Sequence, residues 1–378
     1  MPTPTPGEMS PRLYQSLDEI ETPAVVVDLD QMEQNMQQFA AFADEHEVAL
    51  RSHIKTHKIP ALAHVQEELS GGDGILCQTL GEAEVMAQNG IDDIYLSYMV
   101  VERSKLDRLI WLSSTLNEFT TTVDCRGNVD PLEAAAARHD EVVDVIVEVD
   151  IGLNRVGVEP GQPTVEFAEY VTDQPHLNLA GLMAYEGHIN AEADDENDYE
   201  RLCHEAMEEV AETVALLENA GISVDDVKVG STGTSRYSGK HPVVTEINPG
   251  MYPFNDANLV SWGGPVTRDD CALTVLSTII SNPTDDRVVV DAGSKTMSRD
   301  TDQPPITTTD RGIVYANASE EHGWIDTSHA TETFTVGDRL EFIPPHVCTT
   351  VNLHDTLIGV RNGRVEEVWN IQARGKVR

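Results

Sequence analysis

The alternation of strand-like and helix-like segments constrains the fold of this chain more than any other feature. Between residues 48 and 248, eight short apolar or β-branched runs are separated, in most cases, by helical or polar stretches. These runs are 48–55, 74–79, 94–100, 118–124, 143–150, 178–185, 226–231 and 243–248. Eight strands that alternate with helices over roughly 200–250 residues are typical of a (β/α)8 barrel. An open doubly wound sheet is the alternative, but no Gly-x-Gly-x-x-Gly motif opens a helix after an early strand.

The character of the sequence changes near residue 266. Short segments rich in Thr and Val follow, joined by Gly, Pro and Asp turns, at 272–280, 287–291, 312–316, 339–342, 357–361 and 365–370. Such a series predicts a small all-β domain. We therefore expect an α/β chain with two domains, a (β/α)8 TIM-like barrel over 22–265 and a C-terminal all-β domain over 266–378.

The charge of the chain excludes some classes of partner. Its 378 residues include 65 acidic and 25 basic side chains, for a formal net charge of −40. This balance argues against nucleic-acid binding and against attachment to an anionic membrane. An even spread of carboxylates suits a high-salt cytosol, where the Debye length falls to roughly 3 Å and self-repulsion is screened.

The cysteines and the N-terminal residues indicate the compartment. The five cysteines are scattered, and their number is odd, which is typical of a reducing compartment. The start, Met-Pro-Thr-Pro-Thr-Pro-Gly, lacks the charged and apolar regions of a secretory signal. No apolar run is long enough to span a bilayer. We expect a cytoplasmic protein.

A lysine lies where the first barrel strand is expected to end. Residues 51–58 read Arg-Ser-His-Ile-Lys-Thr-His-Lys, and the alternating pattern stops at Pro60. Working residues of a barrel follow the carboxyl ends of its strands. Cationic neighbours at His53 and His57 would favour the neutral amine of Lys55, which can form a Schiff base. His53 is also a candidate cofactor contact, and an ordinary surface lysine is the alternative.

The loop after the seventh expected strand offers a phosphate site. Residues 230–235, Gly-Ser-Thr-Gly-Thr-Ser, supply backbone N–H groups and several hydroxyls. The loop lacks the Lys of a Walker motif, so a nucleoside triphosphate is not expected. A plain turn is the alternative, although such barrels usually bind phosphate at this position. A phosphate loop and a rim lysine together predict pyridoxal phosphate, with its aldehyde on Lys55. Its phosphate would lie on Ser231, Thr232, Gly233 and Thr234.

Further candidates follow other expected strands. Arg155, in Gly-x-x-Arg-x-Gly, would face the cofactor ring or be an ordinary surface arginine. Tyr185 and Tyr252 would contact the cofactor or only pack. His188 would be a general base or a satisfied rim histidine. Asp256, at the end of the stretch 248–256, is another cofactor-binding candidate.

A second cluster lies in the expected β domain, in the sequence Pro-Pro-His-Val-Cys-Thr-Thr at 344–350. On an extended segment His346 and Cys348 point to one side, because strand side chains alternate. Imidazole and thiolate favour Zn²⁺ and also accept Mn²⁺ or Co²⁺. Two protein ligands would leave positions for water and substrate. A buried Cys beside a core His is the alternative.

Together these motifs resemble the D-threonine aldolase and D-serine dehydratase family of alanine-racemase-like (fold-type III) pyridoxal phosphate enzymes. The match spans nearly the whole chain and is most specific at 51–56, 230–234, 249–256 and 345–348. The resemblance implies that Lys55 carries pyridoxal phosphate and that a His-x-Cys pair binds a divalent metal. It also implies a homodimer, and a first strand, 22–30, that joins the β domain.

The resemblance further implies a lyase that acts on D-β-hydroxy-amino acids. If His188 takes the proton of the substrate hydroxyl, the Cα–Cβ bond breaks and glycine and an aldehyde form. If Lys55 removes the Cα proton instead, the hydroxyl leaves, and a 2-oxo acid and ammonia form. Cys348 is more familiar from dehydratases, whereas residues 185–188 and 350–352 look more like the aldolase branch. We expect a D-threonine aldolase, with a D-serine dehydratase as the alternative.

Two other classes fit the motifs less well. An amino-acid racemase would use Lys55 and a tyrosine as opposed bases and would need no metal, so the His-x-Cys pair argues against it. A non-catalytic pyridoxal phosphate carrier would be a bare barrel, so the C-terminal domain argues against that.

Overall fold

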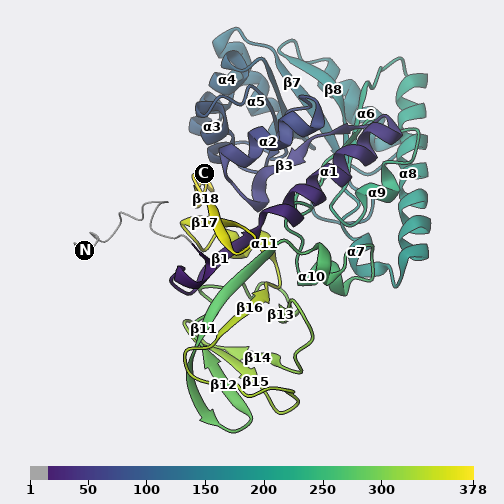
Figure 1. Cartoon of the computed structure of the whole chain (residues 1–378). Coiled ribbons are helices and arrows are strands. Elements are labelled where there is room, and N and C mark those ends of the chain that lie inside the picture. Colours follow the sequence, from purple (N-terminus) through teal and green to yellow (C-terminus); the bar gives the residue numbers. More distant parts are fainter. Residues whose placement is uncertain (1–15) are drawn as a thin grey trace. The chain divides into compact units, whose positions relative to one another are not determined.

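The computed structural model describes residues 16–378, and the Pro- and Thr-rich start lies outside the described residues. The chain forms two compact units (Figure 1). The barrel unit comprises 36–252, with the short pieces 262–265 and 375–378. Among the described residues, the β unit comprises 16–35, 253–261 and 266–374.

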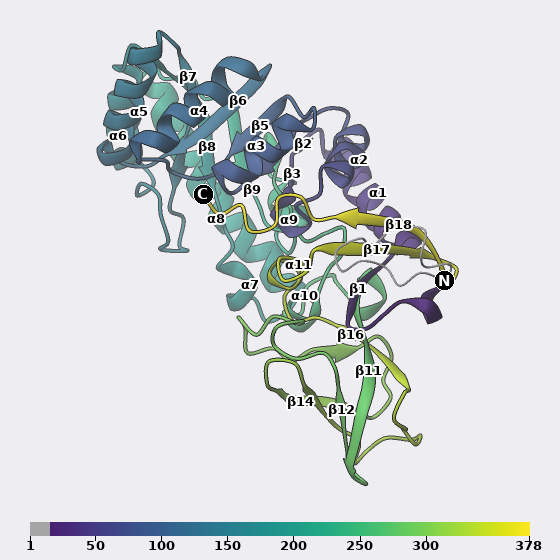
Figure 2. The ribbon, with the colours of Figure 1, turned by 90° about the vertical axis from the view of Figure 1, so that its left-hand side faces the viewer.

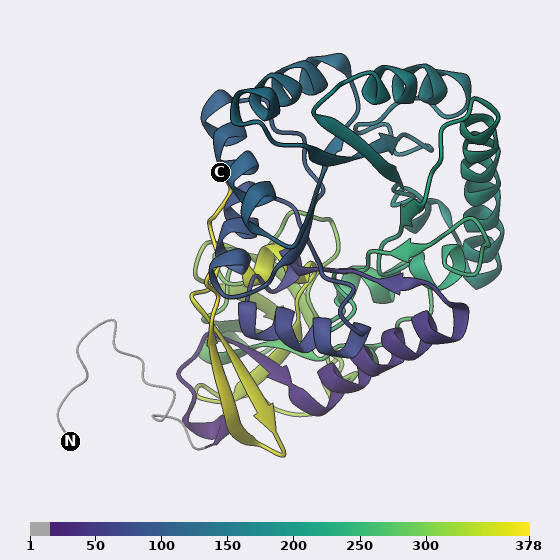
Figure 3. The same ribbon diagram turned by 90° about the horizontal axis from the view of Figure 1, so that it is seen from above.

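The barrel unit is a closed ring of parallel strands (Figure 3). Its strands are β2 (Ala49–Leu50), β3 (Ser52–His53), β4 (Ile75–Cys77), β5 (Asp93–Leu96), β6 (Glu118–Val123), β7 (Val143–Val149), β8 (Leu177–Ala184), β9 (Asp226–Val229) and β10 (Glu246–Ile247). β10 pairs with β2, and β3 pairs with β4. Since β2 and β3 are consecutive pieces of one extended segment, the order β2-β10-β9-β8-β7-β6-β5-β4-β3 closes on itself. The predicted barrel is confirmed.

Helices form the outer layer of the barrel in Figure 3. They are α1 (Leu29–His46), which begins in the β unit, α2 (Pro60–Ser70), α3 (Leu80–Gln88), α4 (Arg103–Thr115), α5 (Arg126–His139), α6 (Gln162–Thr172), α7 (Ile189–Glu192), α8 (Glu196–Asn219) and α9 (Ser235–Ser238). Local sequence sets several boundaries. A capping box of Thr79 and Glu82 opens α3. α2 begins at Pro60, and Gly71, with φ 81°, is its C-cap.

A buried ion network closes the barrel where its first strand is interrupted. Arg51, between β2 and β3, lies 2.6 Å from Asp93 of β5 and 3.0 Å from Glu246 of β10. Lys228 of β9 lies 2.7 Å from the same Glu246. Burial alone would raise the pKa of Glu246, but the charges of Arg51 and Lys228 outweigh it and lower the pKa. Each charge is paired, as buried charges must be.

The β unit is a mixed sheet (Figure 2). Its strands are β1 (Ala24–Asp28), β11 (Leu273–Thr284), β12 (Arg287–Val290), β13 (Ile306–Thr307), β14 (Val314–Ala318), β15 (Gly323–Asp326), β16 (Arg339–Ile343), β17 (Thr356–Arg361) and β18 (Arg364–Asn370). β1 pairs antiparallel with β11 and parallel with β17. The strand expected near 22–30 is therefore part of this sheet.

The boundary between the units differs from the expected one at 265/266, because 253–261 belongs to the β unit. This segment contains α10 (Ala257–Ser261). The backbone N–H groups of Ala257 and Asn258 donate to the carbonyl oxygens of Pro344 and Pro345. These hydrogen bonds connect it to the turn that follows β16. In the described part of the chain, no helix has the length and apolar character needed to cross a membrane.

Candidate active site

Lys55 lies just beyond a barrel strand rather than on it. β3 ends at His53, and Lys55 is the middle residue of a 3-10 turn, η2 (Ile54–Thr56). The turn starts from His53, whose Nδ1 lies 3.5 Å from the backbone nitrogen of Lys55. The lysine is thereby placed at the carboxyl end of the strand, on the rim where barrel enzymes carry their working groups.

The two histidines beside Lys55 are neutral at pH 7. Burial, together with the charges of Lys55 and Arg155, lowers the pKa of His53 well below its usual value. Burial lowers the pKa of His57 to about 4, and its ring bonds to Gln66 and the backbone of Ile59. The expectation that these histidines place positive charge beside Lys55 is therefore wrong, because desolvation removes their protons.

The loop 230–235 has two positions where only glycine fits. Gly230 has φ 108°, and a Cβ there would lie 2.5 Å from Oγ of Ser235. A Cβ at Gly233 would lie 2.0 Å from Oδ1 of Asn190. The hydroxyl side chains that follow the strand, Ser231, Thr232 and Thr234, are buried. The backbone thus packs closely against Ser235 and Asn190 in the loop where the sequence predicts a phosphate site.

Two side chains that the sequence analysis missed hold this loop. The fully buried Glu186 accepts hydrogen bonds from Gly230 N–H at 2.9 Å and from Oγ of Ser238 at 2.6 Å. Burial raises the pKa of Glu186. Asn190 donates to Oγ of Ser231 at 3.0 Å. Both residues lie within two positions of His188 after β8. Their closeness in sequence to this predicted base is the feature that could have identified them.

Three of the predicted rim residues lie close to the loop 150–157. The guanidinium of Arg155 lies 4.9 Å from the ring centre of Tyr185 and 3.3 Å from a carboxylate oxygen of Glu148. The ring of His188 lies over Gly152, where a Cβ would be 2.7 Å from Nε2. Nδ1 of His188 is buried and has no hydrogen-bond partner among the described residues. Such an atom is costly to bury, and a bound ligand would relieve that cost.

Two other predicted cofactor contacts, Tyr252 and Asp256, make buried hydrogen bonds within the protein. Tyr252 is 1% exposed, and its hydroxyl bonds to Oγ of Ser52 at 2.7 Å and to Nε2 of Gln66 at 3.0 Å. Asp256 is fully buried in the β unit, where its carboxylate accepts from the backbone N–H groups of Leu259 and Val347. Burial raises the pKa of Asp256 to about 6. Contact of Tyr252 and Asp256 with the cofactor stays a prediction.

The predicted metal pair lies at the start of a short helix in the β unit. His346 is the N-cap of α11 (Val347–Val351), and Cys348 is the second helical residue. The expected extended segment is therefore wrong, because the N–H of Thr350 closes a turn onto the carbonyl of His346 at 3.1 Å. The two side chains nevertheless meet. Burial lowers the pKa of His346, but hydrogen bonds with Cys348 and Asp300 and the charges of Cys348 and Asp256 outweigh it and raise the pKa to about 10.

Asp300 completes this cluster and was not found from the sequence. Its Oδ2 lies 2.7 Å from Nδ1 of His346, and its Oδ1 accepts from Oγ1 of Thr349 at 3.0 Å. A carboxylate on one ring nitrogen orients an imidazole whose other nitrogen binds metal. Imidazole, thiolate and carboxylate together are a donor set that suits a divalent transition metal.

Comparisons with known proteins agree with both units. The model of the alanine racemase N-terminal domain matches residues 27–257, and that of a putative serine dehydratase domain matches 272–360. The chain is 36% identical to a D-threonine aldolase of Arthrobacter sp over 95% of this chain and 94% of that relative. The chain belongs to the D-threonine aldolase and D-serine dehydratase family. The resemblance seen in the motifs is thereby confirmed.

Other members of this family share the whole architecture. The chain is 34% identical to a 3-hydroxy-D-aspartate aldolase of Paracoccus denitrificans over 95% of this chain and 93% of the relative. The crystal structure of a D-threonine aldolase from Filomicrobium marinum matches with a TM-score of 0.91 and 36% identity, covering 97% of this chain and 99% of that one. The chain is thus a pyridoxal-phosphate-dependent lyase of this family, with a barrel and a β domain.

Proposed function

We propose that this family member is a D-threonine aldolase that cleaves D-β-hydroxy-amino acids into glycine and an aldehyde. The observation that carries the proposal is the full-length similarity to two aldolases. Both of those relatives are named for D-amino acids with a hydroxyl on Cβ. The substrate class therefore follows from what the two names share, and the reaction from the aldolase activity in both.

The barrel unit supplies the groups that would hold pyridoxal phosphate. Lys55 would bond to its aldehyde. Its phosphate would lie on Ser231, Thr232, Gly233 and Thr234, and His53, Arg155 and Tyr185 would surround its ring. The glycines of the loop 230–235 and the unpartnered nitrogen of His188 are features that such a ligand would fit. Pyridoxal phosphate, when bound, supplies an electron sink for the electrons released at Cα.

The β unit supplies the metal ligands. His346 and Cys348 would hold a divalent cation, with Asp300 orienting the imidazole. The thiolate favours Zn²⁺, and Mn²⁺ is the second candidate. The cation, when bound, supplies a Lewis acid that makes a hydroxyl more acidic. Asp256 would fix the start of α11 through the backbone N–H of Val347.

The side chains of the barrel rim would then do the proton transfer. His188 would take the proton of the substrate hydroxyl as a general base. The Cα–Cβ bond breaks, its electron pair stays with Cα, and the carbon that bore the hydroxyl leaves as an aldehyde. A proton then adds to Cα to give glycine. Glu186 and Asn190 would keep the phosphate loop in place throughout.

A dehydratase is the second candidate, and two observations favour it. The match of 272–360 is to a putative serine dehydratase domain, and the metal pair contains Cys348. In that case Lys55 would remove the Cα proton and the hydroxyl would leave, giving a 2-oxo acid and ammonia. The greater similarity to aldolases over the whole chain decides our preference.

We also propose that the protein works as a homodimer in a high-salt cytoplasm. The net charge of −40 supports the high-salt part, because such self-repulsion needs screening.

Incubation with D-threonine, followed by product identification, tests the proposed function. The assay uses purified protein with pyridoxal phosphate and Zn²⁺ or Mn²⁺ in molar KCl, and L-threonine serves as the control substrate. We expect glycine and acetaldehyde from D-threonine alone, and no turnover by the Lys55→Ala variant. 2-Oxobutanoate and ammonia would establish the dehydratase instead.

A further inference from the structure

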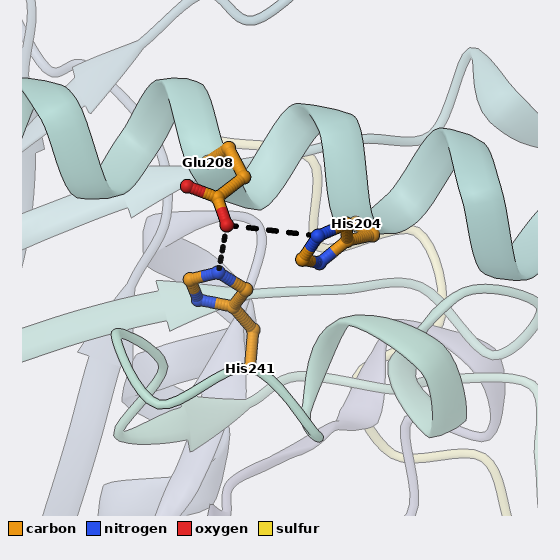
Figure 4. A group of neighbouring side chains, drawn as sticks. All are labelled: His204, Glu208 and His241. Carbon is orange, nitrogen blue, oxygen red and sulfur yellow. Dashed lines mark ion pairs between the residues drawn. The ribbon is translucent and has the colours of Figure 1, made fainter.

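Three metal-binding side chains converge on the outer side of the barrel unit (Figure 4). His204 and Glu208 lie one turn apart on α8, so they share a face of the helix. His241 lies in the loop that follows α9. One ligand atom from each residue lies within 4.8 Å of the other two, and the described residues contain no other such group of three.

The distances fit a cation between these side chains better than direct hydrogen bonds. Oε1 of Glu208 lies 3.6 Å from Nε2 of His204 and 3.5 Å from Nε2 of His241. Hydrogen bonds of this kind are usually about 2.7–3.2 Å long. Ligands about 2.0–2.1 Å from a tetrahedral Zn²⁺ are separated from each other by about 3.3 Å. Oε1 of Glu208 therefore lies at nearly the distance from each imidazole nitrogen that separates two ligands of one Zn²⁺ ion.

The surroundings leave room for a cation and its water. The three side chains line a surface hollow of about 680 Å³, together with Asn197, Glu200, Arg201, Tyr237, Lys240 and Pro242. The two basic residues already face acidic partners. Arg201 pairs with Asp198 and Glu205, and Lys240 lies 3.9 Å from Glu200.

The histidines differ in how firmly they are held. The side chain of His241 is 9% exposed, whereas that of His204 is 63% exposed. Nδ1 of His241 accepts a long hydrogen bond, 3.3 Å, from the N–H of Val243. This contact assigns the ring proton to Nε2. A cation at Nε2 moves the proton to Nδ1, which then faces the N–H of Val243 as a donor, so metal binding must outweigh the loss of this long contact. His204 can adjust freely to complete the site.

We propose that His204, Glu208 and His241 form a second transition-metal site, made of residues other than the His346 and Cys348 pair. Two imidazoles and one carboxylate, with a fourth position open to water, suit Zn²⁺ best. The ion clamps α8 to the loop after α9. The proposal does not depend on the reaction that the enzyme catalyses.

The proposed metal ion also stabilises the loop 230–235, through hydrogen bonds that connect His241 to it. The N–H of His241 donates to the carbonyl oxygen of Ser238 at 3.0 Å. Oγ of Ser238 in turn donates to Glu186, which also accepts the N–H of Gly230. A metal on His241 therefore stabilises the segment that follows the phosphate loop.

Cobalt binding to the full-length protein tests the site, because Co²⁺ replaces Zn²⁺ and absorbs visible light. The Cys348→Ser variant removes the thiolate of the other pair, so any thiolate-to-cobalt band is lost there. We expect this variant to bind one Co²⁺ per chain with a spectrum of nitrogen and oxygen ligands. Adding His204→Gln or Glu208→Gln to this variant weakens cobalt binding at least tenfold. Loss of a residue that only supports a ligand already weakens metal binding by about 10–100-fold, and these two residues are ligands themselves.

Glu205→Gln is the matched control, because it removes the same charge from α8 at a residue that pairs with Arg201. We expect it to leave cobalt binding unchanged. In the Cys348→Ser background, saturating Zn²⁺ should also raise the Tm more than it does when His204→Gln is added. Absence of cobalt binding in Cys348→Ser, or equal losses in Glu205→Gln and Glu208→Gln, would overturn the proposal.

Discussion

At the scale of single residues, the groups around Lys55 show how burial overrides the ordinary charge of a side chain. His53 and His57 are buried against neutral hydrogen-bond partners, and both are neutral at pH 7. The amino-acid sequence alone could not show this, because a His-x-Lys-x-His pattern is equally compatible with an exposed, cationic strand end. The neutral state comes from burial by the folded chain, which outweighs the hydrogen bonds to Gln78, Leu76 and Gln66 that raise the two pKa values.

His57 makes stability depend on pH in a defined window. Its pKa in the folded chain is about 4, below the ordinary 6.5, so between these values the unfolded chain binds more protons. Stability from this residue is complete above pH 6.5 and is lost as the pH falls towards 4, by roughly 3 kcal/mol. We expect His57→Gln to reduce the loss of unfolding free energy between pH 7 and 4.5, measured by urea denaturation.

His64→Gln is the control for this experiment, because that histidine is exposed on the neighbouring helix α2. It should leave the pH dependence of unfolding as in the wild type. Parallel profiles for the wild type and His57→Gln would show that His57 is not responsible for the acid sensitivity.

At the scale of elements, the strand positions of the barrel were predictable and the details of its loops were not. Strand periodicity located β4, β6, β7 and β8 within a few residues, because each is a buried apolar run between polar turns. The short strands β13 and β15 carry too few residues for a pattern. The Thr- and Val-rich residues after His346 favoured an extended chain, but tertiary contacts with Asp256 hold them as α11.

The residues that support the site were missed for a related reason. Glu186, Asn190 and Asp300 act on partners 41 to 52 residues away along the chain. Such contacts exist only after folding, so a single sequence carries no spacing rule for them. Residues that would touch the cofactor themselves, such as Lys55 and the loop 230–235, belong to local motifs and could be found.

Glu186 provides a test of how the phosphate loop is held. Glu186→Gln keeps the shape of the side chain but leaves one acceptor oxygen for the two donors, Gly230 N–H and Ser238 Oγ. A buried donor without its acceptor costs about 1–3 kcal/mol, so we expect pyridoxal phosphate to bind on the order of 10-fold more weakly. Fluorescence titration of the cofactor-free protein measures the affinity, and circular dichroism checks the fold.

Glu192→Gln is a suitable control for that variant, because Glu192 lies on the adjacent α7 and is exposed. Equal affinities for pyridoxal phosphate in the wild type and Glu186→Gln would mean that the carboxylate does not hold the loop.

At the scale of the whole molecule, the charge balance has a measurable consequence. A formal charge of −40 makes the folded chain repel itself at low ionic strength. Raising KCl from about 0.1 M to about 1 M shortens the Debye length from roughly 10 Å to 3 Å, which screens that repulsion. We expect the Tm to rise over this range in a thermal unfolding experiment.

Sucrose at matched water activity is the control for this experiment, because it favours compact states without screening charge. A Tm that is independent of KCl, or that rises equally with sucrose, would contradict the expected role of screening.

The central claim is that the enzyme breaks the Cα–Cβ bond of a D-β-hydroxy-amino acid and does not first remove the Cα proton. The most direct measurement is NMR of D-threonine during early turnover in D2O. The account predicts that unreacted D-threonine keeps its Cα proton while the glycine formed carries solvent deuterium. Deuterium at Cα of unreacted D-threonine, together with 2-oxobutanoate as product, would contradict it and assign proton removal to Lys55.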